Sequence, residues 1–549
     1  MRLLTLLLLL PLMGMAQSFP KDYFAPPLRC PVSLTGGFAE IRPNHFHSGI
    51  DLGIGGKVGE PVYAPADGWV SRINISPWGG GKVLYIDHPN GYRTVYMHLN
   101  DFEGSAAAWV RDYQYAHHCY AFDTVVPAGL IPVRKGQMIA HGGNTGSSGG
   151  PHLHYEIRYC HNDETINPLL FGLPYDDNAA PRILGLRLYP TDDNTLLNGK
   201  HAEADIRLKG ADTIHVEGRF HCGIYTYDLP YQGARNKNGV HTIELYVDGQ
   251  LTSTYSNIQF LFEDTRAVNA LIDYPEYCRS RQYYILSRTL RGAPHPWLFH
   301  QGDGTFTLSE GLHTLKYVVS DHKGNSASHS FYVIATPSLT AYNQSATEEE
   351  RGLPIAYHKP FELKREALQV HIPAGTLYAN DRLLYSTSRN GSRHTLTLLR
   401  HPLPPHQSIT IRMLAPDHPK ALIVNISGTS RSALATKRNG NWLEAKSRSW
   451  GSFEVALDTV APQVTPLNFG KGKQLKERVL RVKITDDLAG LSTYHCYING
   501  TWQLGEYDGK TSTLSVSTAY LKSGSNAIRV VATDACGNST EVNETLVKH

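Results

Sequence analysis

The sequence GSSGGPHLHYEI (residues 146–157) decides how the first part of this chain is interpreted. Successive side chains of a β-strand point to opposite faces, so His152, His154 and Glu156 share one face, and a leucine, a tyrosine and an isoleucine share the other. The core takes the apolar face, so we expect the histidines to face a groove. Taken alone, the pattern favours two solvated histidines on an edge strand over a metal site.

Two other stretches carry residues of the same chemical kind. In the motif HSGID, a fully extended strand would place His47 and Asp51 about 13 Å apart. Zinc bonds to nitrogen and oxygen are roughly 2.0–2.2 Å long, so an extended strand could not bring both side chains to one metal. Gly49 allows the chain to bend between them, and we expect a turn or a strand start inside the motif. His98 ends the hairpin that an Asn-Gly turn predicts over residues 82–99.

Together, the three stretches favour a zinc hydrolase centre. Zinc prefers nitrogen and oxygen ligands in tetrahedral geometry, and catalytic sites leave one position to water. Three protein ligands with further histidines for proton transfer are the composition that such an enzyme needs.

Three motifs occur in a fixed order along the chain: His-x-x-x-Asp, Tyr-x-His-Leu and Gly-Pro-His-Leu-His-Tyr-Glu. The intervening GEPVYAPADGWV and the later INPLLF belong to the same pattern. Over about residues 35–170, the sequence resembles the lysostaphin/LytM-type zinc endopeptidases, which cut peptide bonds in bacterial peptidoglycan. The resemblance implies a compact antiparallel-sheet peptidase fold.

The same resemblance assigns a role to each matching residue. His47, Asp51 and His154 would be the ligands of one Zn²⁺ per chain. His152 would be the general base on the zinc-bound water. His98 would assist it, by holding the tetrahedral intermediate or by relaying a proton.

Composition and the N-terminal residues indicate the compartment. With 41% hydrophobic and 18% charged residues, the chain is that of a folded protein. A net charge of +3 without any basic run gives no case for a nucleic-acid partner. Residues 1–16 predict a cleaved signal peptide whose apolar run is too short to span a bilayer. We therefore expect an exported protein of the periplasm or cell envelope, without a membrane span in its mature form.

An internal repeat organises the second half of the chain. GLHTLKYVVSDHKGNS (residues 311–326) aligns without gaps with GSNAIRVVATDACGNS (residues 524–539). Each copy opens with an acidic-to-proline segment, DDNAAP or DTVAP. Short alternating strands between turn residues favour β-sandwiches. The Asp-x-x-Gly-Asn end of each copy favours a tight turn over the alternative, a set of calcium ligands.

The predicted fold class is mostly β, with a peptidase domain followed by about three β-sandwich (Ig-like) domains. Residues 104–130 are an insertion relative to the family pattern. They include a short predicted helix and are expected to form a groove wall.

An oxidising compartment would allow the disulfides Cys222–Cys278 and Cys496–Cys536, because each pair lies within one predicted domain. The predicted parts are a signal peptide (1–16), a peptidase domain (17–175, insertion about 104–130), an Ig-like sandwich (176–337, insertion about 251–310), a β-rich domain (338–457) and a second Ig-like sandwich (458–549).

The sequence therefore predicts a secreted zinc metalloendopeptidase acting on peptidoglycan crosslinks or stem peptides, with a zinc-bound water as nucleophile. The C-terminal domains would bind the wall or a cell-envelope protein. The alternative is a non-catalytic, peptidase-like scaffold that binds cell wall and activates another wall hydrolase. A structural adhesin is a weaker alternative, because the tail has no recognisable ligand site.

Overall fold

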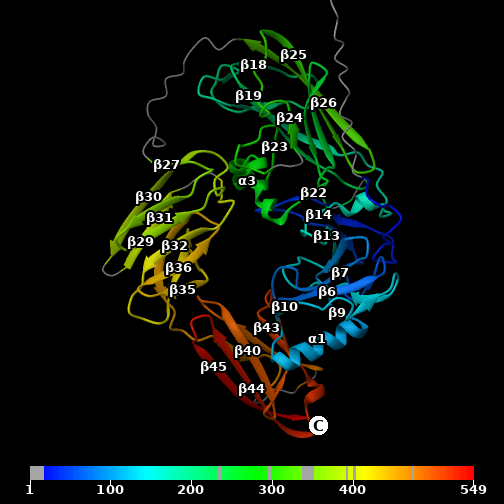
Figure 1. Cartoon of the computed structure of the whole chain (residues 1–549), viewed down its shortest axis with the longest axis vertical. Coiled ribbons are helices and arrows are strands. Elements are labelled where there is room, and N and C mark those ends of the chain that lie inside the picture. The colour runs from blue at the N-terminus through cyan, green and yellow to red at the C-terminus, as the bar shows by residue number, and fades with distance from the viewer. Residues whose placement is uncertain are drawn as a thin grey trace, which may run out of the picture.

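The chain is mostly β, as predicted, and its strands form several separate sheets (Figure 1). The predicted signal peptide lies outside the described residues. No helix in the part of the chain described is long and apolar enough to cross a membrane. The computed structural model describes residues 18–231, 234, 236–294, 298–336, 352–390, 393–399, 403–470, 475 and 477–548.

The main sheet of the first part of the chain is antiparallel, and β13 lies inside it between β4 and β8. The edge-strand alternative for the histidine motif is therefore wrong. Leu153, Tyr155 and Ile157 are at most 1% exposed, which confirms that the apolar face of β13 packs into the core. The strands along the sheet are β1 (Leu34–Gly36), β4 (Ile50–Gly53), β13 (His152–Tyr159), β8 (Tyr92–Met97), β7 (Lys82–Asp87), β6 (Gly68–Ile75) and β10 (Phe122–Val125).

Short elements complete this first unit. The short helix predicted at the start of the 104–130 insertion is confirmed as α1 (Gly104–His117), which ends where His118 takes a left-handed conformation with φ 48°. Its role as a groove wall stays a prediction. The other short elements are β2 (Ile41–Arg42), β3 (His45–Phe46), β5 (Pro61–Tyr63), β9 (Asp101–Phe102), β11 (Pro132–Val133), β12 (Met138–His141), β14 (Thr165–Ile166) and η1 (Pro168–Phe171).

A second unit contains a four-stranded and a seven-stranded sheet. Its strand β22 (Gln259–Phe260) leaves the unit and pairs with β14, so it extends the main sheet of the first unit. The remaining elements are β15 (Arg182–Pro190), β16 (Leu196–Leu197), β17 (Ala204–Ile206), β18 (Thr213–Glu217), β19 (Phe220–Tyr227), β20 (Thr242–Val247), β21 (Gln250–Ser256), η2 (Phe262–Ala267), α2 (Val268–Leu271), α3 (Tyr274–Ser280), β23 (Ile285–Leu286), β24 (Leu298–His300), β25 (Gly311–Ser320) and β26 (Ser326–Thr336).

The third unit pairs a six-stranded with a five-stranded sheet. Its elements are β27 (Leu353–Ile355), β28 (Phe361–Arg365), β29 (Leu368–Ile372), β30 (Asp381–Asn390), β31 (Arg393–Leu399), β32 (Ile409–Leu414), β33 (Ala421–Ser427), β34 (Ser430–Ala433), β35 (Thr436–Asn439), β36 (Trp442–Ser447) and β37 (Gly451–Leu457).

The fourth unit has two four-stranded sheets and returns to lie beside α1 of the first unit (Figure 1). The Tyr520 and Tyr115 hydroxyl groups are 2.8 Å apart at this contact. Its elements are β38 (Gln463–Pro466), β39 (Val479–Thr485), β40 (Leu491–Ile498), β41 (Thr501–Gln503), β42 (Gly505–Asp508), β43 (Thr513–Ser517), η4 (Thr518–Tyr520), β44 (Gly524–Asp534) and β45 (Ser539–Lys548).

The repeat appears as two equivalent hairpins, β25–β26 and β44–β45. In each, the aspartate that begins the Asp-x-x-Gly-Asn segment accepts a hydrogen bond of 2.9 Å from the backbone N–H of the asparagine that ends it. The predicted tight turn is confirmed in both copies.

The predicted disulfides are wrong, because all seven cysteines are free. Cys222 is buried in β19, whereas Cys278 is exposed on α3, so the two side chains lie in different environments. Cys496 is buried, and Cys536 is only half-buried in the turn that follows β44.

Candidate metal centre

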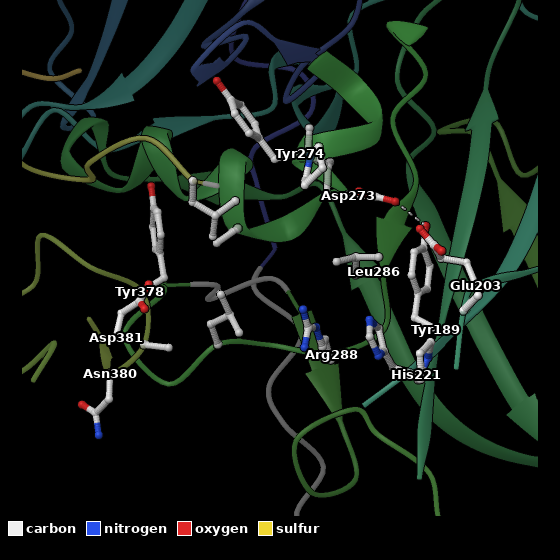
Figure 2. Close-up of a pocket in the computed structure, with 18 of the residues that line it drawn as sticks. Tyr189, Glu203, His221, Asp273, Tyr274, Leu286, Arg288, Tyr378, Asn380 and Asp381 are labelled. Atoms are coloured by element: carbon white, nitrogen blue, oxygen red, sulfur yellow. Dashed lines mark hydrogen bonds between the residues drawn. The ribbon is translucent and has the colours of Figure 1, made fainter. Parts of the chain in front are cut away.

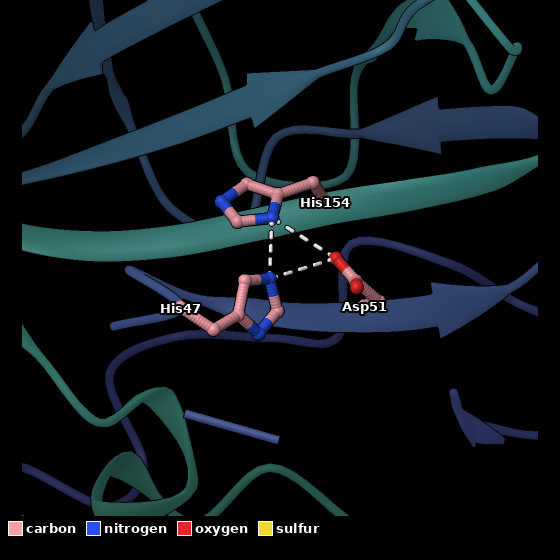
Figure 3. A group of neighbouring side chains, drawn as sticks. All are labelled: His47, Asp51 and His154. Atoms are coloured by element: carbon pink, nitrogen blue, oxygen red, sulfur yellow. Dashed lines mark hydrogen bonds and ion pairs between the residues drawn. The ribbon is translucent and has the colours of Figure 1, made fainter. Parts of the chain in front are cut away.

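His47, in the turn before β4, lies together with Asp51 and His154 of the main sheet (Figure 3). The His47 Nε2 and His154 Nδ1 atoms are 2.9 Å apart. Asp51 Oδ1 lies 2.9 Å from His154 Nδ1 and 3.0 Å from His47 Nε2. Bonds of 2.0 Å to a tetrahedral zinc would separate its ligand atoms by about 3.3 Å, which is close to the observed spacing. All three residues are buried.

The chain turns inside the HSGID motif, as the sequence predicts. His47 follows the short strand β3, and β4 begins only at Ile50, where Asp51 pairs with His154 of β13. Gly49 is required at the turn because an added Cβ would lie 2.4 Å from the Tyr155 carbonyl oxygen. The turn brings His47 and Asp51 to the same point, which an extended strand could not do.

Gly49→Ala is expected to lower the free energy of unfolding by about 1–3 kcal/mol, because the methyl group overlaps backbone of β13. The matched control is Gly149→Ala, since an added Cβ at that position meets nothing within 4 Å. Urea unfolding of both variants checks the prediction. Equal stabilities for the two variants would contradict the close approach at Gly49.

When both histidine rings are neutral, their hydrogen bonds leave the two facing nitrogens without protons. His47 Nδ1 lies 2.7 Å from the Gly37 carbonyl oxygen and donates to it. His154 Nε2 lies 2.9 Å from Glu156 Oε1 and donates to it. In the neutral rings, His47 Nε2 and His154 Nδ1 therefore present lone pairs to each other and to the Asp51 carboxylate. Three lone-pair donors that face one another in this way require a positive charge between them.

The electrostatics of the group agree with this requirement. Burial lowers the pKa of His47 to about 4, so its ring is neutral at physiological pH. Burial also opposes charge on His154, but the carboxylates of Asp51 and Glu156 raise its pKa to about 9. The centre therefore attracts a proton strongly, and a metal ion would supply the same charge with all three donors as ligands. The residues fit a bound Zn²⁺.

Asp51 has a second partner that the sequence did not reveal. Its Oδ2 atom accepts a 2.6 Å hydrogen bond from Arg42, which leaves Oδ1 facing the two histidines. Gly36 makes room for this ion pair, since an added Cβ would lie 2.5 Å from Oδ2. Burial alone would raise the pKa of Asp51, but hydrogen bonds and charges from the neighbouring histidines hold it well below its usual range.

Glu156 shares the histidine face of β13, as predicted, but it lies under the centre rather than in an open groove. Its side chain is fully buried and accepts hydrogen bonds of 2.5 Å from Ser48 Oγ and from Arg158 Nε. Burial alone would raise the pKa of this carboxyl. Arg158 and His154 have the larger, opposite effect and lower the pKa to about 2. Glu156 is therefore ionised and fixes the orientation of His154.

His152 and His98 lie next to the three clustered residues, with ring centroids 4.8 Å apart. His152 Nδ1 lies 2.8 Å from the Gly150 carbonyl oxygen, and its Nε2 lies 3.4 Å from Asp51 Oδ1. His98 Nδ1 lies 2.9 Å from the Thr145 carbonyl oxygen. Burial and the neighbouring imidazoles lower the pKa of His98 to about 3, so its ring is neutral. With its Nδ1 proton directed to Thr145, its Nε2 carries a lone pair.

Other units support the loops of this centre. In the second unit, Thr265 Oγ1 accepts a 2.9 Å hydrogen bond from the Phe46 backbone N–H, directly before His47. In the fourth unit, Lys510 donates hydrogen bonds to the carbonyl oxygens of Asn144 and Ser148, in the loop that leads to His152. Neither contact could be predicted from the sequence, because each joins segments more than 200 residues apart.

A separate cavity lies elsewhere in the molecule (Figure 2). Its volume is about 500 Å³, and it lies between the second unit, which contributes His221 and Arg288, and Tyr378 of the third unit. Asp273 at its edge accepts a 3.0 Å hydrogen bond from Tyr189. None of the residues lining it belongs to the histidine cluster.

The geometry agrees with the comparisons to known proteins. A model of peptidase family M23 matches residues 45–116. Lipoprotein NlpD of Yersinia enterocolitica is 30% identical over 118 residues, which are 22% of this chain and 95% of that protein. The chain belongs to peptidase family M23. An uncharacterised metalloprotease of Haemophilus influenzae is 37% identical over 151 residues, or 28% of this chain and 24% of that protein.

Another relative is named for its activity on peptidoglycan. Peptidoglycan DD-endopeptidase ShyB of Vibrio cholerae is 32% identical over 130 residues, or 23% of this M23 chain and 24% of that protein. The chain thus matches about a quarter of the length of the H. influenzae and V. cholerae relatives. Outside the M23 region, a Zu5-like domain model matches residues 354–458.

Proposed function

We propose that this protein is a zinc metalloendopeptidase that hydrolyses peptide bonds in peptidoglycan crosslinks or stem peptides. The observation that carries the proposal is the convergence of two imidazole nitrogens and one carboxylate oxygen, with both ring protons directed to other acceptors. Membership of the M23 family and the relative named as a peptidoglycan DD-endopeptidase support the substrate class.

Each residue of the centre has a distinct task in this proposal. Bound zinc would polarise the scissile carbonyl and lower the pKa of a water molecule. His47, Asp51 and His154 hold the metal. His152 accepts the proton of the attacking water at Nε2, because its Nδ1 is held by the Gly150 carbonyl. His98 also has a free Nε2, since its Nδ1 donates to Thr145, and this favours proton relay over hydrogen-bond donation to an oxyanion.

Glu156→Gln is expected to lower the affinity for zinc by about 10–100-fold, because the amide no longer supplies the charge that orients His154. Competition with a chromophoric chelator measures the affinity. Glu310→Gln is the matched control, since Glu310 is exposed and distant in sequence from the centre. An unchanged affinity in Glu156→Gln would show that His154 is not oriented through this contact.

The proposed function is tested on purified peptidoglycan, with mass analysis of the released fragments from walls of different crosslink chemistry. Muropeptides shortened at a peptide bond should appear with the zinc-loaded protein, disappear after treatment with 1,10-phenanthroline and return when zinc is restored. Fragments cut in the glycan strand, or equal release with and without the metal, would refute the proposal.

The same experiment separates the enzyme from the alternative of a non-catalytic scaffold. A scaffold would bind one zinc and the wall but release no fragments by itself. The complete set of donors in this chain favours the enzyme.

We further propose the organisation predicted from the sequence. The protein is exported to the periplasm or cell envelope, and the peptidase domain is followed by β-domains over residues 176–337, 338–457 and 458–549. These C-terminal domains bind the wall or a partner protein of the envelope.

A further inference from the structure

A second cluster of metal-binding side chains lies in the second unit. One carboxylate oxygen from each of Asp177, Asp228 and Asp321 lies within 4.8 Å of the others. Asp228 directly follows β19, Asp321 directly follows β25, and Asp177 precedes β15, so three separate segments bring them together. Asp228 and Asp321 are each 4% exposed.

This buried negative charge has no ion-pair partner among the described residues. None of the three carboxylates forms an ion pair in the described structure, and the ammonium group of nearby Lys323 lies over the Tyr175 ring, 4.5 Å from its centroid. Burial and the mutual repulsion of the carboxylates raise the pKa of Asp228 to about 7 and of Asp177 to about 6. Repulsion between the buried carboxylates therefore destabilises the cluster when they are ionised.

Three buried side-chain oxygen atoms that line one small cavity at the cluster have no hydrogen-bond donor. These are the Oδ1 atoms of Asp228, Asn238 and Asn257, and each of these residues is 4% exposed. Asp177 and Asp321 line the same cavity. A buried oxygen atom without a hydrogen-bond donor destabilises the fold, so these atoms call for a partner. The cavity volume of about 30 Å³ has room for an ion or a water molecule but not for an organic ligand.

The repeat provides an internal comparison. Alignment of the two copies equates Asp177 with Asp458 and Asp321 with Asp534. In the fourth unit, Asp458 accepts hydrogen bonds of 3.2 and 2.8 Å from two backbone N–H groups, and the Lys420 ammonium reaches into the turn and bonds Asn538. A lysine ammonium from the third unit thus reaches the turn of the second copy, whereas the lysine in the turn of the first copy, Lys323, directs its ammonium to the Tyr175 ring.

We propose that Asp177, Asp228 and Asp321, together with the amide oxygen of Asn238, bind one Ca²⁺ ion. Calcium prefers carboxylate and amide oxygens and accepts irregular arrangements of six to eight ligands, whereas magnesium requires a near-octahedral set. All the candidate ligand atoms are oxygens, which makes the cluster unlike the nitrogen-rich zinc centre.

The ion lies at the junction between the second unit and the segment that orients His47. Gly37, whose carbonyl oxygen accepts the hydrogen bond from His47, lines the same cavity. An added Cβ at Gly37 would lie 3.4 Å from the Cβ of Asn238. Bound calcium would therefore hold the second unit against the loop that contains Gly37, whose carbonyl oxygen orients the zinc ligand His47.

Binding is tested with full-length mature protein that has been freed of calcium and loaded with one equivalent of zinc. Terbium is the luminescent probe, because Tyr175 lines the cavity and can transfer excitation energy to it. We expect saturable tyrosine-sensitised emission that calcium displaces, and at least about 10-fold weaker binding in Asp228→Asn. Asp193→Asn is the control, because Asp193 is exposed on the same unit.

Thermal unfolding distinguishes an ion site from a merely structural carboxylate. Without calcium, Asp228→Asn should be as stable as the wild type or more stable, because it removes buried repulsion. With millimolar calcium, only the wild type and Asp193→Asn should gain in unfolding temperature. Destabilisation of Asp228→Asn in calcium-free buffer, or no saturable terbium binding by the wild type, would overturn the proposal. Neither experiment measures peptidase activity, so the outcome is independent of the proposed catalytic function.

Discussion

Replacing His154 with alanine is expected to abolish both stoichiometric zinc binding and hydrolysis of peptidoglycan. The substitution removes one of three converging donors and leaves Asp51 and His47 alone. The loss of zinc affinity should exceed the roughly 10–100-fold that removal of an outer-shell partner costs. Metal content by mass spectrometry and fragment release from purified walls measure the two effects.

The control for this variant has to separate metal loss from unfolding, because Glu156 loses a buried partner in His154→Ala. His47→Gln tests the centre from another segment and leaves the Glu156 contacts intact. His161→Ala removes an exposed histidine shortly after β13 and should retain zinc and activity. A folded His47→Gln or His154→Ala protein that still holds one tightly bound zinc would contradict the proposed ligand set.

The sequence predicted the centre where short-range geometry determines it. Alternation in β13 separates His152 and His154 from the buried Leu153, and the spacing of His47 and Asp51 requires the bend that Gly49 provides. These relations depend on the period of a strand and on one glycine. These two relations can therefore be predicted from a few neighbouring residues.

The partners of the ligands could not be predicted in this way. Arg42 of the short strand β2 bonds Asp51 of β4, and the Gly37 carbonyl fixes the ring of His47. Neither contact has a characteristic spacing in the sequence. Every residue has a backbone carbonyl, so the sequence does not indicate which one accepts the hydrogen bond from His47. The Asp177, Asp228 and Asp321 cluster is harder still, since its members are 51 and 93 residues apart and only the fold of the second unit joins them.

The two disulfide predictions failed for a related reason. They relied on cysteines lying in the same predicted domain, and proximity in the chain does not fix on which side of a strand or helix a side chain emerges. Cys222 points into the core of its unit, whereas Cys278 is exposed.

His152→Ala should separate proton transfer from metal binding. We expect the variant to keep one equivalent of zinc, because His152 is not among the three clustered donors. Its kcat on peptidoglycan should fall by about 10²–10⁴-fold, which is the usual contribution of a general base. Metal analysis of the purified variant and rates of fragment release provide the two measurements.

His98→Ala and the double variant extend this test. The His98 and His152 rings are neighbours, and both direct their Nδ1 atoms to backbone carbonyls, so we expect them to act as one proton-transfer unit. If they act together, the double variant should lose little more activity than His152→Ala alone. Losses that multiply would show that the two histidines act in separate steps. Loss of zinc from His152→Ala would instead make this residue a ligand and reverse the division of roles along β13.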